Sequence, residues 1–156
     1  MKKWIISIPI VLVLIFVAGF FKVYYSSMEP VKAAERKSLK LAGEEISKVD
    51  DFHIYNGQEQ VNVLEGRNKQ GKKIIVWIPE KSKQVIVKQA KDGISKEEAI
   101  QKLMQEKNPK KIISVRLGME KNIPLWEIYY RSQNNLINYY YIDFETGKWL
   151  KKIENL

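Results

Sequence analysis

The residues best suited to acid–base chemistry or metal binding stand together in one short stretch, Asp50-Asp51 followed by His53. Carboxylates beside an imidazole can move protons or hold a divalent cation. The chain has 1 histidine and no cysteine, which excludes a two-histidine zinc site, a thiolate site and any disulfide. Three such groups at an expected junction between a helix and a strand more often form a turn or a cap. We therefore expect no metal, no cofactor and no catalytic residue.

Motifs of the common enzyme classes are missing from the rest of the sequence. No serine is followed by a lysine three residues later, as a penicillin-type nucleophile requires. No glycine-rich phosphate loop follows an expected strand, and the stretch NGQEQ lacks the spacing of a calcium loop. The sequence therefore predicts a protein that is not an enzyme.

The N-terminal segment has the composition of a membrane anchor. Lys2 and Lys3 precede an apolar run from Trp4 to Phe21, which at about 1.5 Å per residue nearly spans a bilayer core. The bulky stretch FKVYYSS follows, where a cleaved signal peptide would have small residues. We expect an uncleaved, single-pass anchor in the cell membrane. The positive-inside rule favours a cytoplasmic N-terminus and an extracytoplasmic remainder.

The net charge of +9 leaves two interpretations open. The lysines are scattered rather than gathered into a stripe, and the main part of the chain is expected outside the membrane, so we expect no nucleic-acid partner. The excess of positive charge can belong to a solvated, lysine-rich surface, or it can attract anionic wall polymers or lipid headgroups weakly.

The chain beyond the anchor begins with one helix followed by short strands. Helical spacing predicts a single buried face formed by Ala34, Ser38, Leu41, Ala42, Glu45, Ile46 and Val49. Short β runs follow, and turn residues separate them at Asn56-Gly57, 68–71 and 81–83. The run KKIIVWIPE is apolar on both of its alternating faces. One face fits the helix, and the other fits either the second half of the chain or another protein.

The same pattern restarts at about residue 92, offset by about 64 positions. Ser95 and Glu98 have the spacing of a capping box. The buried face of the helix that follows is expected at Ala99, Ile100, Leu103 and Met104. Further strands are predicted, with connections at 118–124 and 132–135. Because about 60 residues make a marginal core, the two copies are expected to pack together through part of their sheets.

Alternation in the last strands predicts one buried and one outward face of the second sheet. The more apolar set is expected under the helix: Trp126, Ile128, Tyr130, Tyr140, Ile142 and Phe144. The opposite face then presents Tyr129, Tyr139 and Tyr141 with Arg131, residue types that are frequent at binding hot spots. Three interpretations stay open for this face: a partner-binding surface, packing between the two copies, or plain exposed sheet.

The C-terminal hairpin resembles the end of a PepSY domain. The residues that carry the resemblance form a D-x-x-T-G-x-hydrophobic pattern at Asp143, Thr146, Gly147 and Trp149. In the first copy, Pro79 and Lys83 stand where Asp143 and Gly147 stand in the second, so that copy has lost the motif. With the anchor and two copies, the whole chain is similar to the TseB-like cell wall elongation regulators of bacilli.

The resemblance implies an α+β fold in which an N-terminal transmembrane helix precedes two tandem cystatin-like or PepSY-like units, each with one helix packed on an antiparallel sheet. The expected divisions are 1–27 for the anchor, 28–91 for the first unit and 92–156 for the second. The resemblance also implies a non-catalytic regulator of wall elongation whose partner is a membrane-bound penicillin-binding transpeptidase. PepSY units also occur in propeptides, so an inhibitor or chaperone of a secreted protease is the alternative.

Overall fold

The computed structural model describes residues 2–156, with side chains described at 12–26 and 28–156. The chain divides into two compact parts, one ending at Lys37 and the other comprising Ser38–Leu156. The side chains of Lys2, Lys3 and residues 4–11, on which the predicted anchor partly rests, lie outside the described residues.

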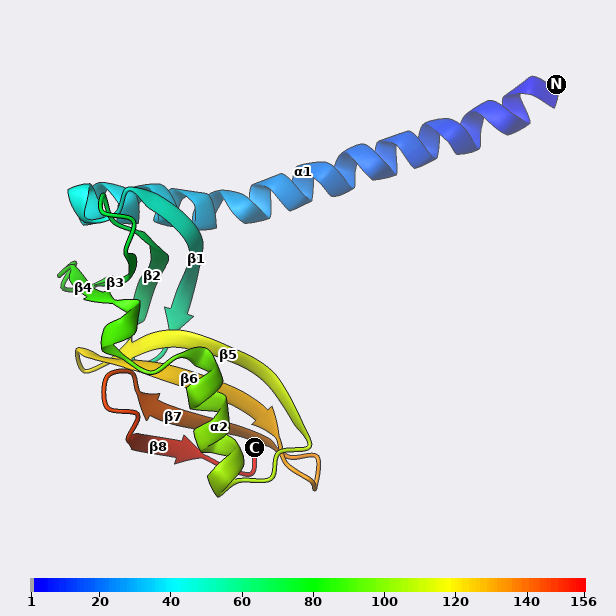
Figure 1. The fold of residues 1–156 in the computed structure, drawn as a ribbon. Helices are drawn as coiled ribbons and strands as arrows, with labels where there is room; N and C mark the ends of the chain where they lie inside the picture. Colours follow the sequence, from blue (N-terminus) through cyan, green and yellow to red (C-terminus); the bar gives the residue numbers. More distant parts are fainter. Residues whose placement is uncertain (1) are drawn as a thin grey trace. The chain divides into compact units, whose positions relative to one another are not determined.

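A single helix, α1 (Lys2–Ala42), runs through the predicted anchor and continues beyond it (Figure 1). By length and composition, its apolar part is sufficient to cross a membrane. The helix ends because Gly43 takes the left-handed conformation, with φ +56°, that commonly follows a helix C-terminus. The prediction that the helical face continues to Val49 is therefore wrong, since a 3₁₀ turn (Gly43–Glu45) and then a strand follow.

The first sheet is an antiparallel meander in the order β1-β2-β3-β4. Its strands are β1 (Lys48–Asn56), β2 (Gln60–Arg67), β3 (Lys73–Pro79) and β4 (Ile86–Gln89). One face packs against the C-terminal end of α1 and the residues after it, and the buried core there consists of Ala42, Ile46, Leu64, Ile74, Val76 and Ile78. The turns between the strands lie where the sequence predicts them.

The second sheet repeats this meander in the order β5-β6-β7-β8, with α2 across one face (Figure 1). After a 3₁₀ turn (Ala90–Asp92) come α2 (Lys96–Glu106), β5 (Lys111–Glu120), β6 (Ile123–Arg131), β7 (Ile137–Asp143) and β8 (Trp149–Ile153). The predicted capping box is confirmed, because Ser95 and Glu98 exchange hydrogen bonds of 2.7 and 3.1 Å. Ala99 and Leu103 are buried as expected, whereas Met104 is 53% exposed, contrary to the prediction.

The two sheets share one hydrophobic core, which confirms that the two copies pack together. Trp77 of β3 and Phe144, just after β7, meet edge to face with ring centroids 5.3 Å apart. The second apolar face of β3 is thus covered by the second half of the chain. Gly118 lies inside β5 and not in the predicted connection, which is reduced to Lys121 and Asn122, both with positive φ.

The repeat is visible in backbone geometry even where side chains differ. The first strand of each sheet carries a pairing irregularity at a matching point. In the turn before the last strand, Lys83 N donates to Pro79 O and Gly147 N donates to Asp143 O. Lys83 has φ +54°, close to the +63° of Gly147, so the first copy keeps the turn although its motif is lost. The fold is α+β, as predicted, and the proposed divisions at 1–27, 28–91 and 92–156 stay a prediction.

Candidate binding site

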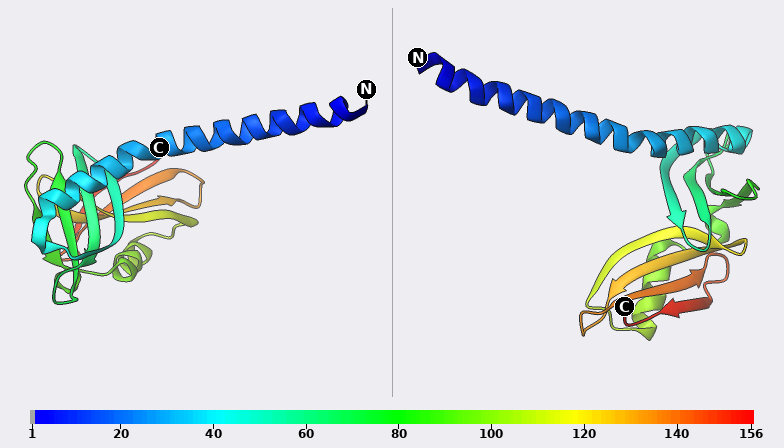
Figure 2. Two further views of the ribbon diagram at one scale, coloured as in Figure 1. Left: turned by 90° about the horizontal axis from the view of Figure 1, so that it is seen from above. Right: turned by 180° about the vertical axis from the view of Figure 1, so that it is seen from behind.

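The predicted binding residues Tyr129, Tyr139 and Tyr141 form a continuous stack, called here the tyrosine ladder. Tyr129 on β6 is directly opposite Tyr139 on β7, and their ring centroids lie 4.8 Å apart. Tyr141 continues the stack at 6.3 Å from Tyr139. Strand alternation places the ladder on the face opposite α2. That face is turned to the viewer in the right panel of Figure 2, where α2 lies behind the strands.

The two ends of the ladder differ in burial. Tyr141 is 5% exposed and belongs to the core shared with Tyr55 of β1, whereas Tyr129 and Tyr139 are half-buried. Burial, with the Glu127 carboxylate adding to it, raises the pKa of Tyr141 above its usual range, so its hydroxyl stays neutral. Packing between the sheets accounts for Tyr141, and the open end at Tyr129 and Tyr139 keeps accessible aromatic surface.

Cationic side chains border the ladder. Lys151 Nζ lies 4.3 Å from the Tyr141 ring centroid and pairs with Glu120 at 2.5 Å. Arg116 pairs with the buried Glu127 carboxylate at 2.7 Å. The Nε of Arg131, the fourth predicted residue, is buried without a hydrogen-bond partner among the described residues. Sequence reasoning missed Arg116 and Lys151, although alternation along β5 and β8 could have placed both on this face.

The opposite face of the second sheet is buried as the sequence predicts. Trp126 is 7% exposed and donates its indole N–H to Ile94 O at 2.9 Å, which ties the sheet to the segment before α2. The other predicted core residues are all at most 3% exposed: Ile128, Tyr130, Tyr140, Ile142 and Phe144. This burial fixes which side of β6 and β7 presents the ladder.

The D-x-x-T-G motif builds the turn that joins β7 to β8. Asp143 Oδ1 accepts hydrogen bonds from the Thr146 backbone N–H at 2.6 Å and from its hydroxyl at 2.7 Å. Gly147 takes positive φ, and a Cβ there would lie 2.6 Å from Lys102 Cε of α2. The motif therefore has a structural role, holding β8 and its Lys151 beside the ladder.

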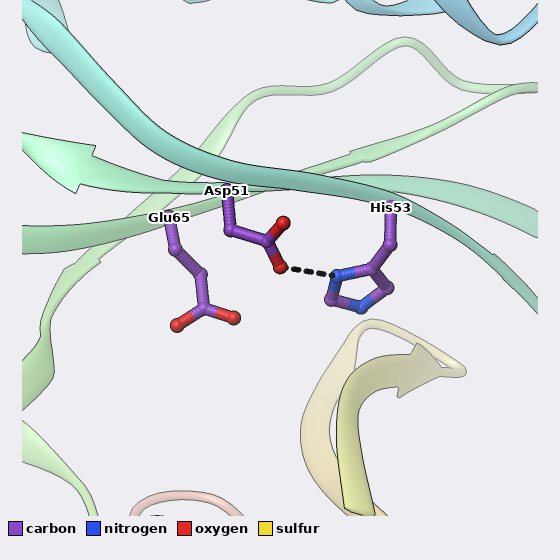
Figure 3. Close-up of side chains that lie close together, drawn as sticks. All are labelled: Asp51, His53 and Glu65. Atoms are coloured by element: carbon purple, nitrogen blue, oxygen red, sulfur yellow. Dashed lines mark ion pairs between the residues drawn. The ribbon is translucent and has the colours of Figure 1, made fainter. Parts of the chain in front are cut away.

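The acid–base residues of the sequence lie inside a strand and not at a junction, so their interpretation as a turn or cap is wrong. Asp51 and His53 are both on β1, and Asp51 is directly opposite Glu65 of β2 (Figure 3). His53 Nε2 lies 2.8 Å from Leu117 O of the second sheet. Burial raises the pKa of Glu65 and the charge of Asp51 adds to this effect, while His53, Lys96 and Lys73 offset it in part.

Two domain families match this chain in separate segments. The "Cell wall elongation regulator TseB-like domain" matches residues 43–79, from the end of α1 through β3. The "Peptidase propeptide and YPEB domain", or PepSY, matches residues 93–153, which comprise α2 and the whole second sheet. The second match includes the tyrosine ladder and the D-x-x-T-G turn.

A solved structure and a protein sequence from Bacillus subtilis extend the similarity over the rest of the chain. The solved structure of the YpmB protein is 33% identical and superposes with a TM-score of 0.71, covering 79% of this chain and 95% of that one. The protein described as "Probable cell wall elongation regulator TseB", from strain 168, is 30% identical over an alignment 159 positions long, which covers 98% of this chain and 99% of the relative. On this similarity, the chain belongs to the family of TseB-like cell wall elongation regulators.

Proposed function

We propose that this protein is a membrane-anchored, non-catalytic module that regulates wall elongation by binding a penicillin-binding transpeptidase at the open end of the tyrosine ladder. The observation that carries the proposal is the stacked, half-exposed pair Tyr129 and Tyr139 beside Arg131. Tyrosine and arginine dominate the energetics of protein interfaces because they combine large contact area with polar groups. Arg131 adds a half-buried guanidinium group to this end of the ladder, and its accessible N–H groups can donate to a carboxylate of the partner.

The proposed anchor makes a weak interface sufficient. The apolar part of α1 would hold the protein in the membrane with its N-terminus in the cytoplasm, and Tyr24 and Tyr25 suit the membrane–water interface. A partner in the same membrane then meets the ladder at a raised effective concentration. Regulation follows from binding itself, which stabilises one conformation or one location of the partner.

In-cell photocrosslinking tests the proposal. A photoreactive residue replaces Tyr129 or Tyr139, and Trp149, which is 51% exposed on β8, serves as a control on the same sheet. We expect one penicillin-binding transpeptidase to be captured from both ladder positions and not from the control. Capture that is equal at all three positions, or crosslinks confined to this chain, would show that the ladder is not a partner surface.

A second candidate is inhibition or chaperoning of a secreted protease, which the match of residues 93–153 to the peptidase propeptide family supports. The purified chain would then inhibit a secreted peptidase of the same cell at stoichiometric concentration, or accelerate its refolding. Neither effect is expected if the protein acts only on wall synthesis.

Weak contact with anionic wall polymers can accompany either function, because the net charge is +9. Exposed charges are screened over about 10 Å at 0.1 M salt. Retention of the protein by purified walls is therefore expected to fall steeply between about 0.05 and 0.2 M salt, and retention that is insensitive to salt would contradict this contact.

A further inference from the structure

The geometry points to a divalent metal site at Asp51, His53 and Glu65, on the face of the first sheet that is turned toward the second (Figure 3). We infer that these three side chains bind Zn²⁺ or Mn²⁺ through two carboxylates and the imidazole Nδ1. The site is separate from the tyrosine ladder and does not depend on the function proposed above.

Strand geometry brings the three ligands together. Asp51 and His53 are two residues apart on β1 and so share a face, and Glu65 is paired with Asp51 across the β1–β2 ladder. One donor atom from each side chain lies within 4.8 Å of the other two. Asp51 Oδ2 and His53 Nδ1 are 3.7 Å apart, near the roughly 3.4 Å between two donors of a tetrahedral shell with bonds of about 2.1 Å. Small side-chain rotations can therefore bring the three donor atoms to the distances that one bound ion requires.

The second sheet prepares His53 to be a ligand. Leu117 O, 2.8 Å from Nε2, can only accept a hydrogen bond, so Nε2 bears the proton. In the neutral ring, the lone pair is then on Nδ1, the nitrogen that faces Asp51. Histidines that bind metals almost always donate their other N–H to a carbonyl or carboxylate, which fixes the tautomer and the ring orientation. Here that carbonyl comes from β5, so the site depends on the packing of the two sheets.

Without a metal ion, the negative charges at this position are only partly compensated. Asp51 and Glu65 are like charges directly opposite each other on neighbouring strands, an arrangement that destabilises a sheet. Among the described residues, no lysine or arginine forms an ion pair with Glu65, and the charges of Lys73 and Lys96 offset the cost of its burial only in part. A dication between the carboxylates would remove their repulsion and the cost of partial burial of Glu65.

The donor set selects the metal class. An imidazole with two carboxylates suits Zn²⁺ or Mn²⁺ better than Ca²⁺ or Mg²⁺, which prefer oxygen alone. Three protein ligands leave at least one coordination position for water. A cleft of about 390 Å³ between the sheets, lined by Asp51 and Glu65 together with Lys73 and Lys96, gives an ion access to this position.

Isothermal titration calorimetry of the whole chain in detergent tests the site. Metal ions are first removed with a chelator and any histidine tag is cleaved off. The protein is then titrated with ZnCl₂ or MnCl₂. The variants are His53→Gln, whose side-chain amide can still donate a hydrogen bond to Leu117 O, and Glu65→Gln, which keeps the shape of the side chain. Asp50→Asn is the matched control, because the neighbouring Asp50 carboxylate pairs with Lys48 at 3.4 Å and with Arg67 at 3.7 Å. We expect one ion per chain for the wild type and the control, and affinity at least about tenfold weaker for the other two variants.

Nitrogen-15 NMR of the imidazole gives a second readout, because the chain has 1 histidine and its signals need no assignment by mutation. With ZnCl₂, the Nδ1 resonance is expected to shift to the metal-bound range while Nε2 keeps its proton. No binding by the wild type, equal affinity in all four proteins, or metal bound while the Nδ1 resonance is unchanged would each overturn the site. Circular dichroism of each variant confirms that a lost affinity is not a lost fold.

Discussion

The close packing of Tyr55 between two glycine backbones predicts a strong energetic coupling between the sheets. Tyr55 is 0% exposed, and a Cβ on Gly118 would lie 2.5 Å from its ring, about 1 Å inside ordinary contact distance. The ring cannot simply move away, because a Cβ position on Gly57 is also 2.5 Å from its other edge. Overpacking of this kind costs typically 1–3 kcal/mol, so Gly118→Ala is expected to lower the free energy of unfolding by about 2 kcal/mol.

A double-mutant cycle tests the physical cause. Tyr55→Ala alone is expected to cost about 3–5 kcal/mol through the cavity that it leaves. Once the ring is absent, the added methyl group of Gly118→Ala has room, and its extra cost is expected near zero. Tyr55→Phe is the matched control, because it keeps the ring and removes only the hydroxyl that donates to Glu120 at 3.3 Å. In that background Gly118→Ala is expected to cost as much as in the wild type.

Denaturant unfolding of the full chain in detergent, followed by tryptophan fluorescence, measures each free energy. A coupling energy between Tyr55→Ala and Gly118→Ala of about 1–3 kcal/mol is expected for residues in direct contact. Additive effects of the two substitutions, or a cost of Gly118→Ala below about 0.5 kcal/mol, would refute the argument, since the sheets would then not meet at this point.

Three further predictions concern local features. Lys83→Gly is expected to stabilise the protein by about 0.5–1 kcal/mol, because it relieves the strain of a left-handed lysine at φ +54°, and this gain exceeds the extra backbone entropy of glycine in the unfolded state. Gly147→Ala is expected to destabilise the protein by backbone strain and by contact with α2, and thermal unfolding of both variants checks the pair. Ser95→Ala should cost about 1 kcal/mol through the lost capping bond to Glu98, measured in the same way. Burial raises the pKa of four tyrosines above the usual value of about 10. Above pH 10 the unfolded state therefore loses protons that the folded state keeps, and the free energy of unfolding falls as pH rises. Denaturant unfolding between pH 8 and 11.5 checks this, and a constant free energy would contradict the raised pKa values of Tyr55, Tyr130, Tyr140 and Tyr141.

Features encoded locally could be predicted from the sequence. Period-2 alternation identified both faces of β6 and β7, and the spacing of Ser95 and Glu98 identified the start of α2, because each depends only on residues a few positions apart. The apolar sequence of β3 also showed correctly that both of its faces are covered. The pattern could not show where α1 ends, because its end depends on the backbone conformation of Gly43.

Features that depend on contacts distant in sequence could not be predicted. Glycine is a typical turn residue, so the sequence predicts a connection at Gly118. Its place inside β5 is explained only by the Tyr55 ring that packs on it. Asp51 and Glu65 become neighbours through the register of β1 with β2, which the strand patterns leave undetermined. The Leu117 carbonyl that binds His53 comes from the other sheet, 64 residues away.

The two sheets contribute differently to the ladder. Tyr55 of the first sheet donates to Glu120, Glu120 pairs with Lys151, and Lys151 lies over the ring of Tyr141. The inner end of the ladder is therefore held by the first sheet, while Tyr129 has no described link of this kind to it. A substitution at Tyr141 must then alter both the packing between the two sheets and any binding of a partner. A substitution at Tyr129 can alter binding with little change in the free energy of unfolding. Effects on partner capture that appear at Tyr129 without a loss of folding free energy would thus come from the surface itself, and effects confined to Tyr141 would come from the packing of the two sheets.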